Sequence, residues 1–394
     1  LNSGAQFNLL QGNWIGTNRA LEPDLGNRDA GVMINLANNN LIGGLLPGEG
    51  NVIVGDRLPG VRSANGNGNE ISANSIFDNG YAGIDIGEFL ISPNDALDPD
   101  DVGNRKQNYP LLFSASVDAG GTEVEVRLQN EPNTQYRIEF FNSAECHASG
   151  FGEGNLFIGR RTVTTDEQGE AVAFYTFNQV TLLPFLTATV TDGEGNTSEF
   201  SPCLEIGGNP AGQIQFFHDS VLAYEGVFPA ARVILTRSHG FTGTVSAEFT
   251  VSNDTALAGQ DYIGADQIVS FAEAESIKVI EIPLLVDPAI EASPEKAQLA
   301  LAPATGGAEL GMAASELFIF DENQGAPGLI IDDTVMTEGQ SGIRMMRFDV
   351  SLSASERAFS LDFRTLDGSA SAGEDYIANQ GTLNFEASAV QQQR

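Results

Sequence analysis

FTVSNDTALAGQDYI, at residues 249–263, recurs as FRTLDGSASAGEDYI at residues 363–377. In both copies a phenylalanine comes first, small turn residues follow, and an Ala-Gly pair precedes an Asp-Tyr pair by one residue. A later phenylalanine also matches, Phe271 with Phe385. The copies are 114 residues apart (363 − 249), which is long enough for one β-sandwich domain each. The repeat therefore predicts two similar sandwiches in the second half of the chain.

The composition favours short strands and an acidic surface. The 394 residues include 44 glycines and one tryptophan, and the length predicts about two to four domains. Lys and Arg total 19 against 53 Asp and Glu, a formal net charge of −34. Repulsion from phosphate excludes nucleic acid as a natural partner. Clustered carboxylates repel each other less once they bind a divalent cation, so we expect cation binding. The alternative is that the acidity only keeps a secreted protein soluble.

Zinc sites and membrane spans are not indicated. There is no Cys-x-x-Cys pair, and the histidines His147, His218 and His239 are scattered. No run of about 18 apolar residues could span a membrane. The pattern is already under way at Leu1 and stops inside the second repeat, so we expect a longer protein whose targeting signal lies elsewhere.

Residues 1–108 carry a shorter pattern, in which asparagine is followed two residues later by isoleucine. Short apolar triplets between Asn and Gly suit narrow coils, whose asparagines can stack into hydrogen-bonded ladders. The stretch resembles right-handed parallel β-helices of the pectate-lyase-like kind, and is similar to the last coils of such a helix. The pairs are Asn13/Ile15, Asn40/Ile42, Asn51/Ile53, Asn69/Ile71 and Asn74/Ile76.

Many β-helices are polysaccharide lyases or hydrolases, so an enzyme is an alternative. Such sites use clustered carboxylates, or Ca²⁺ with a basic residue as proton acceptor. No motif joins the candidates, and the alternative, which we prefer, is that they are solvated residues at coil corners. They are Asp78, Asp85 and Glu88, with Arg57 and Arg62.

The segment 94–110, NDALDPDDVGNRKQNYP, alternates oxygen-bearing side chains around a glycine. Asp98, Asp100, Asp101 and Asn104 could wrap one Ca²⁺ in a short loop, although the distal glutamate of an EF-hand is missing. The alternative is an acidic interdomain linker.

The pattern of residues 109–206 predicts a β-sandwich. Stretches such as TEVEVRL and FLTATVTD alternate apolar and polar residues, with turn residues between them. The ending TATVTDGEGNTSEFSPC resembles Ig-like domains that follow β-helices in large bacterial surface proteins. Cys146 and Cys203 both lie here, 57 residues apart (203 − 146). We expect them to pair if the protein is extracellular, at a gain of about 4 kcal/mol in the chain-entropy model; otherwise they are two buried thiols.

Residues 214–323 and 329–394 contain the two repeats. In VSAEFTV, one strand face is predicted to carry Val245, Ala247, Phe249 and Val251. Acidic residues of the first repeat fall at predicted strand ends, where the loops of a sandwich gather. Ca²⁺ takes six to eight oxygens, and several loops can supply them. These acids are Glu225, Asp261, Asp287, Glu291, Glu295, Asp321 and Glu322.

With Thr-Ala-x-Ala-Gly-x-Asp-Tyr and the closing apolar-Asp-acid, this combination resembles Calx-β domains. The resemblance implies Ca²⁺ as the cofactor, bound by the seven acids above, with the Ile290 carbonyl as a further ligand. The family's usual Glu-x-x-Glu is one residue longer here, which makes Glu295 the least secure ligand. Its paired Asp is reduced to Asp287 followed by a proline. The alternative is the same sandwich with solvated acids.

The second repeat keeps two of the acidic positions, Glu338 and Asp375. Asp332 and Asp333 lie near the junction and could also serve the first repeat. The chain ends before the remaining acids, so we expect no complete site in this copy.

The whole sequence predicts an all-β protein, with parallel β-helix coils followed by immunoglobulin-like antiparallel sandwiches. We expect a non-enzymatic, modular bacterial protein, secreted or on the cell surface, that binds calcium and has a structural or adhesive role. The resemblance implies other proteins or cell-surface glycans as partners. A fragment of a carbohydrate-active β-helix enzyme is the alternative.

Overall fold

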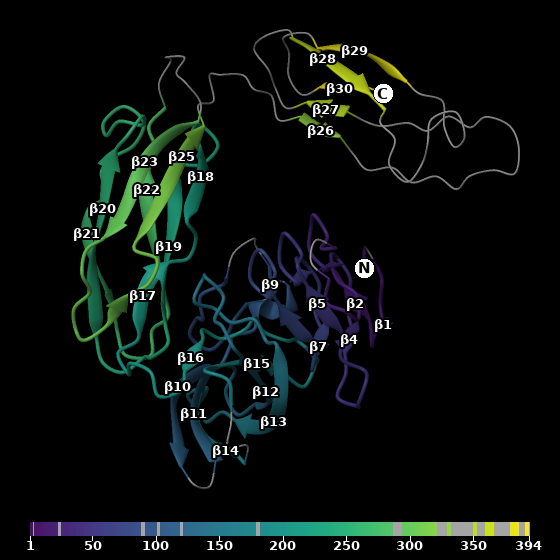
Figure 1. Cartoon of the computed structure of the whole chain (residues 1–394), viewed down its shortest axis with the longest axis vertical. Helices are drawn as coiled ribbons and strands as arrows, with labels where there is room; N and C mark the ends of the chain where they lie inside the picture. Colours follow the sequence, from purple (N-terminus) through teal and green to yellow (C-terminus); the bar gives the residue numbers. More distant parts are fainter. Residues whose placement is uncertain are drawn as a thin grey trace, which may run out of the picture. The chain divides into compact units, whose positions relative to one another are not determined.

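The computed structural model describes residues 1–2, 4–22, 25–87, 91–100, 103–118, 121–178, 182–286, 294–320, 329–331, 350–352, 359–365, 379–385 and 391–393. Contacts divide the chain into two compact units. The first comprises Leu1–Ala223, Phe228–Leu285 and Lys296–Phe318; the second comprises Tyr224–Val227, Val286–Glu295 and Ile319–Arg394. The described elements are strands plus one 3-10 turn, η1 (Asn104–Lys106), as Figure 1 shows. None of the described helical residues forms a helix that could cross a membrane. The all-β fold class is confirmed.

The first unit begins with three small parallel sheets built from three-residue strands and shorter ones (Figure 1). Each strand pairs with the third strand after it, in the orders β1-β4-β7, β2-β5-β8 and β3-β6-β9. The strands are β1 (Leu9–Leu10), β2 (Trp14–Ile15), β3 (Val32–Ile34), β4 (Leu41–Gly43), β5 (Val52–Val54), β6 (Val61–Ser63), β7 (Glu70–Ser72), β8 (Ser75–Phe77) and β9 (Ile84–Ile86).

This strand order means that the chain visits the three sheets in turn and then repeats the circuit one layer further on. Like residues stack in register, such as Ile42 on Ile71 and Ile53 on Ile76, and all four are buried. The stacks are parallel, as the short repeats predicted. Their assignment to a pectate-lyase-like helix stays a prediction.

Polar side chains at the turns of successive coils form ladders. Asn8 Nδ2 donates to Asn40 Oδ1 over 2.8 Å, and Asn40 Nδ2 donates to Asn69 Oδ1 over 2.8 Å. The asparagine stacking expected from the Asn-x-Ile pattern is therefore present. We call each residue of a ladder a rung. Some rungs lie outside the Asn-x-Ile pattern, and one of them is an aspartate, Asp56. The three ladders are Asn8–Asn40–Asn69, Asn13–Asn51–Asn74 and Asn27–Asp56–Asn79.

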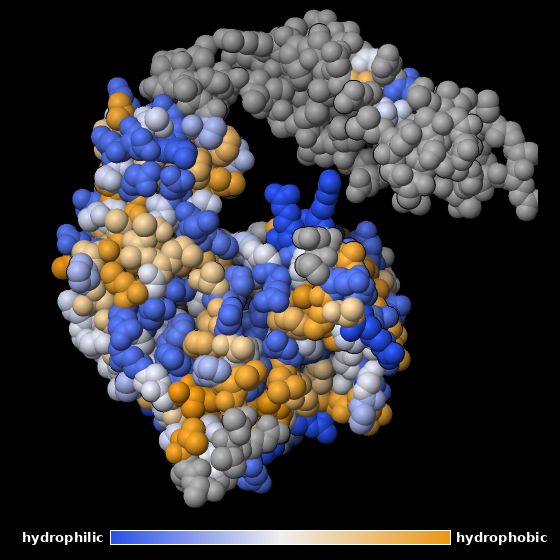
Figure 2. Space-filling view, in the orientation of Figure 1, coloured by the Kyte–Doolittle hydropathy of each residue, from blue (hydrophilic) through white to orange (hydrophobic). Residues whose placement is uncertain are grey.

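The first sandwich packs two antiparallel sheets, β10-β11-β14 and β13-β12-β15-β16. Alternating residues such as Val124, Ile138 and Val190 fill the space between them. Cys146 and Cys203 form a disulfide, with Cα atoms 6.1 Å apart. Exposed apolar side chains gather low in Figure 2, in the region where Figure 1 shows β10 to β14. The strands are β10 (Leu111–Asp118), β11 (Gly121–Gln129), β12 (Gln135–Ser143), β13 (Leu156–Thr164), β14 (Glu170–Phe177), β15 (Phe185–Thr191) and β16 (Leu204–Glu205).

The second sandwich has sheets in the orders β22-β19-β17-β24 and β18-β25-β23-β20-β21. Val245, Ala247 and Phe249 are buried while Glu248 is exposed, so the predicted alternation is confirmed over residues 245–249; Val251, predicted for the same face, is half-buried. The strands are β17 (Gln213–Phe216), β18 (Ser220–Tyr224), β19 (Ala230–Ser238), β20 (Val245–Asn253), β21 (Gln267–Phe271), β22 (Ile277–Pro283), β23 (Glu295–Leu301), β24 (Glu309–Leu310) and β25 (Ala314–Phe320).

The second unit contains the remaining described strands. They form an antiparallel sheet β26-β27-β30 and an antiparallel pair β28-β29. Their bounds are β26 (Leu329–Ile331), β27 (Val350–Leu352), β28 (Phe359–Arg364), β29 (Gln380–Phe385) and β30 (Gln391–Gln393).

Candidate calcium site and the coil cap

Asp261 lies in the loop that joins β20 to β21, and local hydrogen bonds hold it there. Its side chain is only 3% exposed, and Oδ2 accepts from the backbone N–H of Leu257 over 2.6 Å. Its carbonyl accepts from the N–H of Leu285 over 2.9 Å. Across the loop, Asn253 Oδ1 accepts from the Tyr262 hydroxyl over 2.6 Å. The pKa of Tyr262 is raised, mainly because the side chain is buried and further because the carboxylates of Asp266 and Asp261 lie nearby. The loop thus presents Asp261 from a closed, hydrogen-bonded turn.

Two further predicted ligands lie at strand ends. Glu225 directly follows β18, is 5% exposed, and donates its backbone N–H to the Phe320 carbonyl over 3.0 Å. Glu295 opens β23 and is half-buried. Carboxylates of this kind suit a hard cation such as Ca²⁺. Among the described residues, no group of three or more His, Cys, Asp or Glu could hold a metal ion.

The other predicted ligands fall outside the described residues, so the full ligand set stays a prediction. They are Asp287, Ile290, Glu291, Asp321 and Glu322 of the first repeat, Glu338 and Asp375 of the second, and Asp332 and Asp333 between them.

The acidic linker uses its side chains in hydrogen bonds within the chain. Asp98 is 5% exposed and accepts from Gln107 Nε2 over 2.7 Å and from the N–H of Asn108 over 3.2 Å. Burial raises its pKa to about 7. Asn104 Oδ1 accepts from the N–H of Asn69 over 3.0 Å, so Asn104 is the last rung of a coil ladder. Asp100 is half-buried, and Asp101 lies outside the described residues. A calcium ion in this linker stays a prediction.

Four of the five residues considered for carbohydrate chemistry lie in the described part of the chain, and only Arg62 and Asp85 among these four are close to each other. Arg62 Nε lies 3.6 Å from Asp85 Oδ2 on the neighbouring coil, but the Asp85 side chain is 1% exposed. Asp78 and Arg57 are exposed residues outside the strands, and Glu88 lies outside the described residues. In this pair the carboxylate of Asp85 is therefore closed off from solvent, while the side chain of Arg62 is 18% exposed.

The first sandwich closes the end of the coil stack with hydrogen-bond acceptors. The backbone N–H of Ala73 donates to Glu139 Oε2 over 2.8 Å, and that of Ile71 donates to Thr197 Oγ1 over 3.0 Å. We call the accepting residues the coil cap. With their donors they are Glu139 (Ala73), Glu153 (Asn79), Gly154 (Ile76), Asn196 (Gly68), Thr197 (Ile71) and Glu199 (Ile86).

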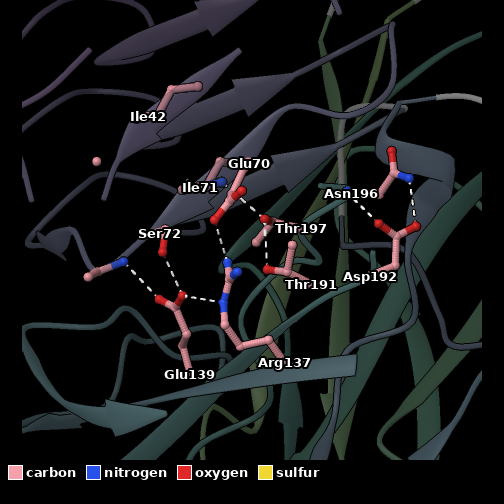
Figure 3. Close-up of polar contacts among 12 residues, drawn as sticks. Ile42, Glu70, Ile71, Ser72, Arg137, Glu139, Thr191, Asp192, Asn196 and Thr197 are labelled. Atoms are coloured by element: carbon pink, nitrogen blue, oxygen red, sulfur yellow. Dashed lines mark hydrogen bonds and ion pairs between the residues drawn. The ribbon is translucent and has the colours of Figure 1, made fainter. Parts of the chain in front are cut away.

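Glu139 has the densest contacts of the coil cap (Figure 3). It is fully buried in β12, and besides Ala73 it accepts from Ser72 Oγ over 2.6 Å and from Arg137 Nε over 3.0 Å. Arg137 Nη2 reaches on to Glu70 Oε1 over 2.6 Å. One arginine thus joins an acid of the last coil to an acid of the sandwich.

Glu153 and Glu199 are buried carboxyl groups, and none of the described basic residues makes a hydrogen bond to either of them. Burial raises the pKa of Glu153 to about 8, and two hydrogen bonds from Asn79 oppose the shift. Burial, followed by the charge of Asp85, raises the pKa of Glu199 well above its ordinary value, while the N–H groups of Ile86 and Ser92 lower it. Burial therefore favours the protonated form of both carboxyl groups.

Sequence reasoning missed these three glutamates. For Glu139 the signal was a charged residue between Ile138 and Phe140 in QYRIEFF, whereas SEFSP around Glu199 carries no such signal. Buried acids are rare unless they have partners. Their donors lie 66 to 113 residues away in the chain, so the sequence pattern did not reveal what they bind.

Comparisons with family models and with solved structures both give matches. None of the curated proteins matches the chain. The solved apo-form Calx CBD1 domain is 21% identical, over 28% of this chain and 96% of that one, with a TM-score of 0.27. The CBD12 structure from CALX1.2 is 20% identical, over 46% and 74%, with a TM-score of 0.31. The Calx-beta domain family matches residues 209–323 and 331–393. These two stretches are therefore similar in sequence to Calx-beta domains.

Proposed function

We propose that this chain is part of a non-enzymatic, modular extracellular protein whose second sandwich binds Ca²⁺. The observation that carries the proposal is Asp261, at the repeated Asp-Tyr pair of a Calx-beta stretch. Its carboxylate is buried at a loop, and its carbonyl is bonded to Leu285, two residues before Asp287 in the sequence. The predicted acids Glu225, Asp287 and Glu291 would supply further anionic oxygens.

The rest of the chain supports a structural role. The coil cap joins the parallel stack to the first sandwich by buried hydrogen bonds, and such a junction suits a stiff spacer. A disulfide is typical of proteins outside the cytosol. For partners, we propose that the protein adheres to other proteins or to cell-surface glycans. We do not extend the proposal to a carbohydrate-active enzyme, because Asp85 is buried.

Calcium calorimetry on the full chain, after chelation and dialysis, tests the proposal. We expect heat of binding and a rise in melting temperature. At a Ca²⁺ concentration of a hundred times Kd, binding should add about 2.7 kcal/mol to the free energy of unfolding. Asp261→Asn keeps an acceptor for Leu257 but removes the charge, and should abolish both signals. Glu248→Gln, on an exposed position of β20, is the matched control and should bind as the parent does. Absence of both heat and a melting shift in the parent would overturn the calcium proposal.

A further inference from the structure

The second sandwich has a groove between β18 and β19. Its volume is about 480 Å³, and apolar side chains of residues 216–223 and 228–234 form most of its lining, together with Tyr81 from the coils. Leu222 and Phe228 at the groove are 59% and 54% exposed. The two strands belong to opposite sheets, and β18 is an edge strand. The groove is therefore an opening at the side of the sandwich.

Part of β19 has an unpaired edge in this groove. The N–H of Leu284 donates to the Pro229 carbonyl, and the N–H of Arg237 donates to the Ser276 carbonyl. In β19 the backbone N–H and C=O groups of odd-numbered residues therefore face β22. The backbone groups of even-numbered residues face β17, as the hydrogen bond from the Phe217 N–H to the Ile234 carbonyl shows.

However, β17 ends at Phe216, which pairs with Leu235. Ala230 and Arg232 therefore point their N–H and C=O groups to a side where no described strand pairs with them. Such an edge accepts a further extended chain.

Polar groups in the groove indicate what that chain carries. Arg232 lines the groove and is exposed, and no ion pair joins it to any described carboxylate within 4.0 Å. Its cross-strand neighbour Glu281 is also exposed. The His218 ring lies 4.6 Å from the Tyr81 ring, and its Nε2 is buried without a hydrogen-bond partner among the described residues. Burial lowers the pKa of His218 to about 4, so the ring is neutral at pH 7.

We propose that this groove binds an extended segment of a partner protein as an added strand, in which acidic residues alternate with apolar ones. Its backbone pairs with Ala230 and Arg232, and its acidic side chains complement the charge of Arg232. Its apolar side chains point to the other face, as Ala231 and Val233 do in β19, and enter the groove beside Leu222 and Phe228. The proposal does not depend on calcium.

Calorimetry of the full chain with the peptide acetyl-Val-Asp-Val-Asp-Val-amide tests the backbone pairing. Hydrogen exchange should show protection of the Ala230 and Arg232 amides when the peptide is bound. The same peptide with both aspartate amides N-methylated keeps its side chains and loses the pairing donors. It should bind about tenfold more weakly or worse, because backbone hydrogen bonds are lost. Equal binding of the two peptides, or no protection at these amides, would overturn the proposal.

Charge reversal tests the complementarity. Arg232→Glu should weaken binding of the parent peptide about tenfold, by placing like charges opposite each other. Arg160→Glu, at an exposed position of β13, is the matched control and should bind as the parent chain does. A parent chain that self-associates through the groove, with these amides protected at high concentration and no peptide present, would assign the groove to a second copy and overturn the partner proposal.

Discussion

Glu153 shows at the scale of one residue how the coil cap depends on protonation. Its carboxyl group is 8% exposed and accepts from the Asn79 backbone N–H and from Asn79 Nδ2. Its pKa rises from an ordinary 4.5 to about 8 on folding. Between these values the unfolded chain loses the proton and the folded chain keeps it, so unfolding releases a proton. The free energy of unfolding therefore falls as pH rises from about 4.5 to about 8, by up to about 1.4 kcal/mol per pH unit.

Glu153→Gln should reduce this pH dependence, since the amide stays neutral and its oxygen can still accept from Asn79. Urea unfolding at pH 5 and pH 8 should show a smaller difference in the variant than in the parent. Part of the difference should remain, because Glu199 acts in the same direction. Glu167→Gln, in an exposed turn, should leave the parent's difference unchanged. An undiminished difference in Glu153→Gln would show that this residue is ionised in the folded chain.

At the scale of elements, the coil cap provides hydrogen-bond acceptors for backbone N–H groups of the last coil. A parallel stack ends in strands whose N–H groups have no further strand to bond. Here β12, the turn before β13 and the segment after β15 supply the acceptors, and Phe141 and Phe200 pack onto the coil core. Gly154 is required at this contact, since a Cβ there would lie 2.6 Å from the Phe200 ring.

Glu139→Ala should destabilise this junction strongly. It leaves the N–H of Ala73, the hydroxyl of Ser72 and the guanidinium of Arg137 without their shared acceptor. Removing one partner of a buried, charged network costs about 3–5 kcal/mol. Hydrogen exchange should accelerate at Ala73 and along β7 to β9, and urea unfolding should shift to lower concentration. Glu123→Ala, an exposed glutamate in β11, is the control, and equal effects of the two substitutions would contradict a specific role for the cap.

The elements were largely predictable, and the contacts between them were not. Alternation in VSAEFTV and the Asn-x-Ile spacing depend on neighbours within a few residues, and both patterns appear in the structure. Asn104 shows the limit: its spacing from Asp98 and Asp100 was compatible with a calcium loop or an acidic linker, and neither interpretation indicated the hydrogen bond from the Asn69 N–H to its carboxamide oxygen, 35 residues away. Asp56 was missed as a ladder rung because the pattern required asparagine. Long-range partners set these roles, and a single sequence does not display them.

For the whole molecule, the disulfide fastens the segment where the two sandwiches of the first unit meet. The N–H of His239, at the end of β19, donates to the Cys203 carbonyl over 2.7 Å, and the N–H of Cys203 donates to the Gly150 carbonyl over 2.9 Å. The bridge therefore restrains both its own sandwich and a contact to the next one.

Cys146→Ser with Cys203→Ser should lower the free energy of unfolding by about 4 kcal/mol, because the unfolded chain regains the freedom of a loop of 57 residues. Scanning calorimetry should show an earlier transition for the double variant, and the parent treated with reductant should match it. If the reduced parent melts as the oxidised parent does, the crosslink contributes nothing to stability.

The asparagine ladders give the side chains of the coil stack a direction. Each rung donates its backbone N–H to the side-chain oxygen of the next rung, from Asn8 to Asn40 to Asn69. The carbonyl of a rung faces the same way, as the bond from the Leu41 N–H to the Asn8 carbonyl shows, so the backbone dipoles largely cancel. After the last coil, side-chain oxygens outside the strands accept these N–H groups: Asn104 accepts from Asn69, and Glu153 accepts from Asn79. A module that covers this end of the stack therefore has to imitate one more coil, with oxygen atoms placed where the next rungs would be.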